Sequence, residues 1–189
     1  PALSTAPIIG FDAPTAGSGK SLLAKCIGIL ATGEVPGMHP PVDDEELKKA
    51  LFASQIGGKT MFILDNVVKP IISDALTSIT TQSISEGRIL GKSENRDVPN
   101  RMLVVVTGNQ LEVSNDLARR MLKVRIDADS ERPYLRKFAF TPEQVVTDTR
   151  QEMVAACLTI IRGAIVSGHK EREAIGDFLD WDRAVRTPV

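Results

Sequence analysis

The stretch Pro14-Thr15-Ala16-Gly17-Ser18-Gly19-Lys20-Ser21 lies between a short apolar run, Ile8–Ala13, and a segment with helical spacing, Ser21–Ala31. Glycines at positions 17 and 19 allow the backbone to approach phosphate oxygens closely and to direct its N–H groups inward. The helix that begins near Lys20 adds the positive end of its dipole. A strand, a glycine-rich turn and a helix in this order predict a phosphate-binding loop.

The residues expected to contact a nucleotide are those of the loop and of the first helical turn. They are Ala16, Gly17, Ser18, Gly19, Lys20, Ser21 and Leu22. In such a loop the lysine bridges the β- and γ-phosphates of ATP, and the Ser21 hydroxyl ligates Mg²⁺. One position departs from the usual pattern: Pro14 replaces the first glycine and cannot take a positive φ. A chance match in a surface loop is the alternative, and the flanking strand and helix argue against it.

Two further apolar runs end in polar residues. Thr60–Asp65 ends in an acid, where a second Mg²⁺-organising carboxylate belongs in this architecture. Asn66 follows, at a position where many P-loop ATPases carry a glutamate that polarises the attacking water. An amide can orient water but is a poor proton acceptor, so we expect either slow hydrolysis or help from another carboxylate that the sequence does not identify. Asn109 ends the run V-V-V-T-G-N and could hold the attacking water or touch the γ-phosphate. A plain turn asparagine remains the alternative there.

Two adjacent arginines precede the last predicted strand. Arg119 and Arg120 lie in N-D-L-A-R-R-M, immediately before Leu122–Ile126. Arginine stabilises transition-state charge on transferring phosphoryl oxygens, either in its own site or in that of a neighbouring subunit. A surface salt bridge is the alternative for either residue.

A polar turn flanked by Arg88–Gly91 and Arg96–Val98 predicts a small hairpin. Its cations outnumber its acids slightly, so it could contact a nucleic-acid backbone. The cations are Arg88, Lys92, Arg96 and Arg101, against Glu86, Glu94 and Asp97. A solvated hairpin is an equal alternative, because no aromatic residue is interleaved for base stacking.

The remaining chain alternates between strand and helix patterns. The helices are expected from Asp44 to Ala53, from Ile71 to Ile84, from Asp116 to Met121, from Pro142 to Val166 and from Phe178 to Arg186. The pattern predicts an α/β fold of three layers with a parallel five-stranded sheet and a helical C-terminal appendage.

Composition narrows the possible classes of protein. The 189 residues include 23 basic and 24 acidic side chains, so any contact with nucleic acid must be local. Cys26 and Cys157 suggest neither a disulfide framework nor a zinc site. No apolar run is long enough to span a bilayer and no secretory signal is visible, so we expect a cytoplasmic location without a membrane partner. The missing initiating Met suggests a domain cut from a longer polypeptide.

The ordered segments A-P-T-A-G-S-G-K-S, F-I-L-D-N, V-T-G-N and D-L-A-R-R-M resemble Walker A, Walker B, sensor 1 and the arginine finger of AAA+ P-loop ATPases. More closely, the chain resembles the ATPase domains of primase-helicases encoded by prophages and mobile elements. The resemblance implies an ATPase core over residues 1–130 and a helical lid-like segment over residues 131–189. It also implies Mg-ATP bound by Lys20, Ser21 and Asp65, with Asn109 as sensor and Arg120, or failing that Arg119, as finger.

The same resemblance implies a ring, expected to be a hexamer, that hydrolyses ATP while it moves along single-stranded DNA. The hairpin is similar in placement to the DNA-gripping hairpin of superfamily-3 and minichromosome-maintenance helicases. Lys92 is therefore the first candidate for a DNA contact, followed by Arg88 and Arg96. The alternatives are an AAA+ loader or remodeller that acts on a protein, and a nucleotide-binding scaffold with weak hydrolysis. A GTPase is disfavoured because no N-K-x-D segment is present, and a small-molecule kinase is harder to exclude.

Overall fold

A five-stranded parallel sheet forms the centre of the protein in a computed structural model that describes residues 5–89, 91, 94–168 and 178–188. The strands lie in the order β2-β3-β6-β1-β7. Their bounds are β1 Ile8–Ala13, β2 Met38–His39, β3 Met61–Val67, β6 Leu103–Asn109 and β7 Met121–Arg125. The predicted α/β class and the parallel five-stranded sheet are confirmed.

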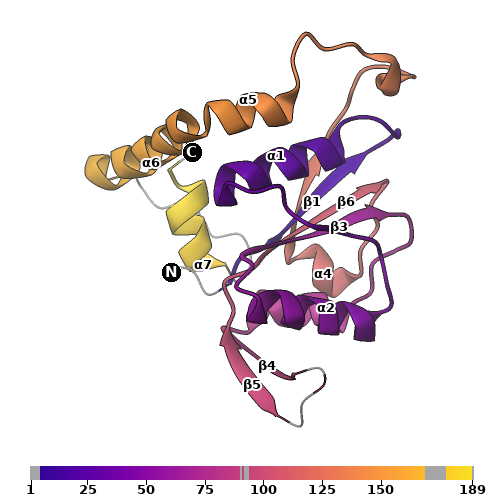
Figure 1. The fold of residues 1–189 in the computed structure, drawn as a ribbon, viewed down its shortest axis with the longest axis vertical. Helices are drawn as coiled ribbons and strands as arrows, with labels where there is room; N and C mark the ends of the chain where they lie inside the picture. Colours follow the sequence, from indigo (N-terminus) through magenta and orange to yellow (C-terminus); the bar gives the residue numbers. More distant parts are fainter. Residues whose placement is uncertain (1–4, 90, 92–93, 169–177, 189) are drawn as a thin grey trace.

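Helices cover both faces of this sheet (Figure 1). Helix α1 (Lys20–Thr32) lies on one face, where Ala24 packs with Phe11, Ile63 and Val105. The other face is covered by α2 (Asp44–Ile56), α3 (Asp74–Thr81) and α4 (Asn115–Ala118). Because β3 and β6 are buried on both faces, they appear in the sequence as continuous apolar runs rather than as alternating patterns. The three-layer arrangement follows from this double burial.

Helix α3 is shorter than predicted. It begins after Ser73, whose hydroxyl accepts a hydrogen bond from the Leu76 N–H at 3.0 Å, because Ile71 is held in a parallel bridge to Val113. It ends at Thr81, and Ile84, which was predicted to be helical, begins strand β4.

Two other helix predictions were wrong in extent. The helix predicted to reach Met121 ends at Ala118, because Met121 pairs with Ile8 at the start of β7. The long helix predicted over Pro142–Val166 is two helices, α5 (Pro142–Asp148) and α6 (Arg150–Ser167). Thr149 separates them, with its hydroxyl donating to the carbonyl of Val145 at 2.7 Å.

The last helical piece is α7 (Leu179–Trp181), which continues into a wider π-type turn over Asp182–Arg186. Phe178, just before it, is buried, so this end of the chain packs against the rest of the molecule. None of the described helices is both long and apolar enough to cross a membrane.

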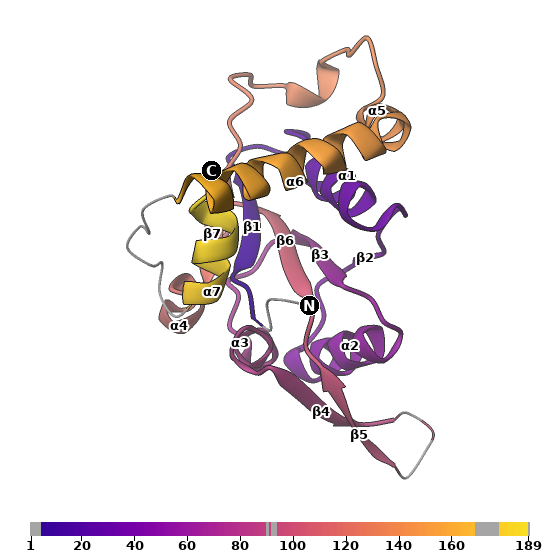
Figure 2. The same cartoon turned by 90° about the vertical axis from the view of Figure 1, so that its left-hand side faces the viewer.

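The predicted hairpin is present, but its first strand lies earlier in the chain than the predicted Arg88–Gly91 and shares only Arg88 with it. The second strand extends the predicted Arg96–Val98 by one residue at each end. Strands β4 (Ile84–Arg88) and β5 (Asn95–Pro99) pair antiparallel and project from the body below α2 and α3 (Figure 2).

A buried amide anchors the base of this hairpin. Asn100 is 2% exposed, and its Nδ2 donates to the carbonyls of Ile79 at 2.6 Å and Gln82 at 2.8 Å. Its Oδ1 accepts from Gln55 Nε2 and from the Met102 N–H, both at 3.2 Å. One side chain therefore joins α2, the end of α3 and the approach to β6.

We expect Asn100→Ala to lower the free energy of unfolding by roughly 3 kcal/mol, because it leaves buried carbonyl and amide groups without partners. Urea denaturation of the whole chain measures the effect. Asn95→Ala, at an exposed hairpin position, is the matched control and should change stability by less than about 0.5 kcal/mol. Equal effects of the two substitutions would show that the hairpin is not anchored by Asn100.

Candidate functional site

The predicted site residues meet at the carboxyl edge of the sheet. Strands β1, β3 and β6 are parallel neighbours, so their carboxyl ends lie side by side. Ala13, the last residue before the loop, is in register with Asn109. Asp65 comes to the same edge near the end of β3.

Lys20 is the centre of the site. Its side chain is buried, and its Nζ donates to Asn109 Oδ1 at 2.6 Å, to Ser18 Oγ at 3.0 Å and to the Thr15 carbonyl at 3.4 Å. Burial lowers the pKa of Lys20 below its ordinary value, and the charges of Asp12 and Asp65 offset part of that shift. The ammonium group is thus held by three neutral oxygens that a charged phosphate could replace.

Asp65 and Ser21 lie within hydrogen-bond distance. Ser21 Oγ donates to Asp65 Oδ1 at 2.6 Å, and Thr107 Oγ1 donates to the same oxygen at 2.6 Å. The Thr107 hydroxyl also accepts from the Asn66 N–H at 3.0 Å. The sequence predicts the strand that carries Thr107 but predicts no role for this residue. Its position two residues before Asn109, on the strand beside Asp65, was the available signal.

Asn66 takes a left-handed backbone conformation, with φ 60°, beside a shift of register between β3 and β6. Asparagine is one of the few non-glycine residues that tolerate this region well. The neighbouring strand needs a glycine here: a Cβ on Gly108 would lie 2.5 Å from the carbonyl oxygen of Val67. The edge of the sheet is therefore shaped by a bulge that turns Asn66 toward the loop.

A pocket of about 280 Å³ lies over these groups. It is lined by Ala16, Gly17, Ser18, Gly19, Lys20, Ser21, Leu22, Asn66, Thr107 and Asn109. Drug-sized ligands usually occupy about 300–1,000 Å³, so this volume suits the phosphate part of a nucleotide. The lining contains all seven residues that the sequence predicts for nucleotide contact.

The side chains present fit a hard divalent cation bound together with a polyphosphate. A hydroxyl and a carboxylate oxygen are the ligand types that Mg²⁺ prefers, and Mg²⁺ usually takes further ligands from water and substrate phosphates. Within the described parts of the chain, no group of three His, Cys, Asp or Glu residues could hold a metal. A cation at Ser21 and Asp65 would therefore depend on phosphate oxygens.

Asp12 holds the segment that follows Asn109, a role that the sequence patterns did not predict. This residue of β1 is 1% exposed, and its Oδ1 accepts from the Leu111 N–H at 2.8 Å, just after Asn109. Lys123 Nζ lies 3.1 Å from Oδ2. Burial by itself raises the pKa of Asp12, but the Leu111 N–H and the charges of Lys123 and Arg125 outweigh it and hold that pKa below its ordinary value.

Arg119 and Arg120 lie at the opposite edge of the sheet from the phosphate loop. The carbonyl of Arg120 accepts from the N–H of Ile8, the first residue of β1. At about 3.3 Å per residue, β1 separates the two edges by roughly 17 Å, which exceeds the reach of an arginine side chain. Both arginines are paired with Asp116, and their side chains are 61% and 10% exposed respectively. The structure does not bring either residue to this chain's own loop.

The hairpin cations do not share one face. Arg96 lies opposite Gly87, whereas Arg88 lies opposite Asn95, so the two side chains leave opposite faces of the ribbon. Glu86 and Asp97 are also paired across the strands, on the face that Arg88 uses. Lys92, the first candidate for a DNA contact, lies outside the described residues.

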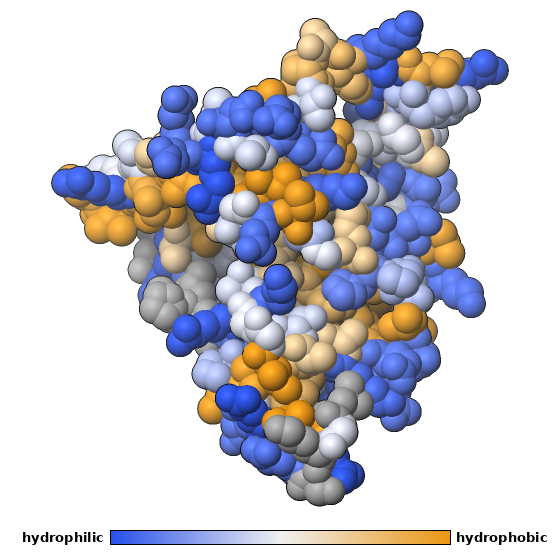
Figure 3. Space-filling model, viewed as in Figure 1, coloured by the Kyte–Doolittle hydropathy of each residue, from blue (hydrophilic) through white to orange (hydrophobic). Residues whose placement is uncertain are grey.

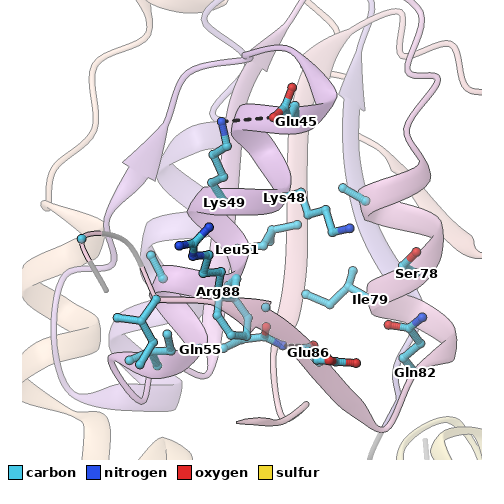
Figure 4. A pocket seen from close by; sticks show the side chains of 18 residues that line it. Glu45, Lys48, Lys49, Leu51, Gln55, Ser78, Ile79, Gln82, Glu86 and Arg88 are labelled. Carbon is cyan, nitrogen blue, oxygen red and sulfur yellow. Dashed lines mark hydrogen bonds and ion pairs between the residues drawn. The ribbon is translucent and has the colours of Figure 1, made fainter. Parts of the chain in front are cut away.

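A second cavity, larger than the site pocket, lies away from it between α2, α3 and the hairpin (Figure 4). It measures about 930 Å³, and most of its lining surface is apolar, with Leu51, Phe52 and Ile79 among the contributing residues. Nine of its eighteen lining residues are nevertheless polar or charged. Figure 3 shows an apolar area on the surface between α2 and the hairpin. None of the predicted nucleotide-binding residues lines this cavity.

No known family model and no curated protein matches the chain. Several solved structures match the chain in fold. The C-terminal region of NrS-1 matches over 76% of this chain with a TM-score of 0.51 and 13% identity, and a second structure of that region matches with 0.48 and 17%. A JCV helicase with a bound small molecule matches over 86% of this chain and 57% of its own, with a TM-score of 0.42 and 14% identity.

At such low identity the match to NrS-1 shows a shared fold and nothing about activity. The chain spans about a third (34%) of the length of the NrS-1 region.

The Asp12 carboxylate leads to a prediction about pH. Because its pKa is lowered in the folded protein, it stabilises the fold above the ordinary value of 3.8, and this contribution is lost as pH falls through the folded pKa. Asp12→Asn should therefore lower the free energy of unfolding at pH 7 by about 1.5–3 kcal/mol, with a smaller difference near pH 3.

Urea denaturation at the two pH values measures this difference, with Asp97→Asn on the exposed hairpin as control. A loss that stays constant between pH 7 and pH 3 would contradict a role for the ionised carboxylate.

Proposed function

We propose that the chain is an ATP-binding and ATP-hydrolysing AAA+ motor domain that acts on DNA, as a helicase or translocase of a prophage or mobile-element replication protein. The observation that supports it most is the meeting of Lys20, Ser21, Asp65 and Asn109 at one edge of the sheet. In this proposal residues 1–130 are the ATPase core and residues 131–189 its helical lid-like segment.

Each group at this edge has a distinct part in the proposed reaction. Lys20 would exchange Asn109 Oδ1 for oxygens of the β- and γ-phosphates. Ser21 and Asp65 would hold Mg²⁺, which neutralises charge on the phosphates when bound. Asn109 would then be free to orient water or contact the γ-phosphate.

Asn66 lines the pocket but supplies no carboxylate. Its amide can orient a water molecule without accepting a proton, so the proposed hydrolysis is slow.

Lys20→Ala should weaken Mg-ATP binding at least tenfold, because a buried charge-assisted contact to phosphate is lost (about 1.4 kcal/mol per tenfold). Asp65→Asn should abolish the Mg²⁺ dependence of binding while leaving residual ATP affinity. Isothermal titration with and without Mg²⁺ measures both, and Lys48→Ala on the exposed surface of α2 is the control. Unchanged ATP binding by the Lys20 variant would refute the assignment of the site.

A ring would supply what one subunit lacks. Since Arg119 and Arg120 lie at the far edge of the sheet, they could complete only the site of a neighbouring copy. Their place in the chain favours Arg120 as the finger, whereas exposure favours Arg119, whose side chain is 61% exposed against 10%. A head-to-tail contact of this kind forms a ring when its rotation closes, and we propose a ring of six subunits.

Mixing two inactive variants tests this arrangement. Subunits with Lys20→Ala lack the phosphate-binding lysine but keep both arginines, and subunits with Arg120→Ala keep the lysine but lack the proposed finger. Random mixing should restore about a quarter of the wild-type ATPase rate, because a quarter of the interfaces combine an intact lysine with an intact arginine. The same experiment with Arg119→Ala identifies which arginine acts. A rate independent of protein concentration and of both arginines would contradict a shared site.

The proposed DNA contact rests on the placement of the hairpin more than on its charge. Because Arg88 and Arg96 leave opposite faces of the stem, they cannot form one basic strip along the ribbon. Single-stranded DNA would therefore meet the turn, where Lys92 lies in the sequence, with one of the two arginines at the side.

Lys92→Ala should weaken the binding of a labelled single-stranded oligonucleotide several-fold and reduce the salt slope by about one. Fluorescence anisotropy at several salt concentrations measures both quantities, with Lys59→Ala as a control outside the hairpin. If Lys92→Ala, Arg88→Ala and Arg96→Ala all leave DNA affinity unchanged, a loader or remodeller of a protein partner becomes the better proposal. ATP binding without turnover would instead favour a nucleotide-binding scaffold.

A further inference from the structure

The segment that follows β7 lies directly against the phosphate loop. A short 3₁₀ turn, Pro133–Leu135, carries Tyr134 beside Gly17. Gly17 has φ 76°, and a Cβ placed on it would lie 2.9 Å from Tyr134 Cβ and 3.2 Å from the Tyr134 backbone nitrogen. The two segments are therefore in contact at the level of their backbones.

Arg136 extends this contact by one residue along the loop. Its Nη2 donates to the carbonyl oxygen of Ser18 at 3.4 Å, and its Nε donates to the carbonyl of Pro133 at 3.2 Å. The guanidinium carbon also lies 5.5 Å from the centre of the Phe138 ring. The side chain is held within its own segment while it contacts the loop.

The Ser18 carbonyl belongs to the same peptide unit as the Gly19 N–H. In a planar trans peptide these two groups point in opposite directions, so an acceptor held on one side sends the donor to the other. Gly19 has φ 99° and no side chain, and glycine is the residue whose peptide planes reorient most easily. A hydrogen bond at Ser18 O therefore controls where the Gly19 N–H points.

We propose that Arg136 is a positioning residue that holds the Ser18–Gly19 peptide so that the Gly19 N–H faces the phosphate pocket. The inference rests on the proposed function, since it assigns a role at the same loop. Ser18, Gly19 and Lys20 line the pocket, whereas Arg136 does not. Arg136 acts through the loop and not on the phosphates.

Helix α1, which begins directly after the loop, is also held at its C-terminal end by a residue that follows the sheet. Arg150 donates from Nε to the carbonyl of Ile29 at 3.1 Å and from Nη2 to that of Ala31 at 3.3 Å, at the end of α1. Residues after the sheet thus brace α1 at both ends, and only the Arg136 end touches the loop. Arg150→Ala is therefore a matched control that removes an arginine brace without touching Ser18.

The test compares Mg-ATP with Mg-tripolyphosphate, a probe without base or ribose. Arg136→Ala should weaken both by the same factor, about fivefold, because the loss lies in the orientation of one donor toward phosphate. That factor should be equal at low and high salt. Arg136→Lys should restore most of the affinity, and Arg150→Ala should leave it unchanged in the folded protein.

Amide resonances give a readout that a change in stability does not move. In the ligand-free protein the Gly19 N–H resonance should broaden or split in Arg136→Ala, because the peptide samples two orientations, while Arg150→Ala leaves it sharp. A wild type that binds neither probe overturns the proposed function itself. Normal binding by Arg136→Ala overturns this inference alone, as does a loss that fades with salt, which indicates direct contact between Arg136 and phosphate.

Discussion

The ammonium group of Lys20 is buried at the carboxyl edge of the sheet, and burying an unpaired charge is too costly for a fold of ordinary stability. The protein meets this constraint with oxygens from two segments, the loop itself and the end of β6. That solution requires β1 and β6 to be neighbours in register, which they are at Ala13 and Asn109. The same edge of the sheet is shaped by the strand order, by the bulge at Asn66 and by the glycine at position 108.

Strand β6 also connects this edge to the hairpin. It begins three residues after Asn100, whose amide ties the hairpin base to α2 and α3, and it ends at Asn109, which holds Lys20. The strand between them is buried on both faces, so it is a stiff connection. Movement of Lys20 toward a phosphate would leave Asn109 without this partner. Asn109 is at one end of β6, and the hairpin is attached at the other end of the same strand.

The sequence predicted the sheet and the loop because both depend on local patterns. Apolar runs of six or seven residues identify strands buried on two faces, and glycines between a strand and a helix identify a phosphate loop. The residues that it missed act across long separations: Asp12 contacts Leu111, Thr107 contacts Asp65, and Arg136 contacts Ser18. The residues next to Asp12 and Arg136 in the sequence do not indicate such a partner, and Thr107 is indicated only by its place on the strand beside Asp65. The predictions of where helices end were wrong for the same reason. Asn100 acts at the end of α3, and Ile8 pairs with Met121 just after α4, and both partners are distant in sequence.

A crystal structure of the chain with Mg²⁺ and a non-hydrolysable ATP analogue tests the proposed site most directly. We predict that Lys20 Nζ leaves Asn109 Oδ1 and binds the β- and γ-phosphates, with Mg²⁺ between Ser21 Oγ, Asp65 and the phosphate oxygens. A nucleotide bound elsewhere, with the Lys20–Asn109 hydrogen bond intact, would contradict it.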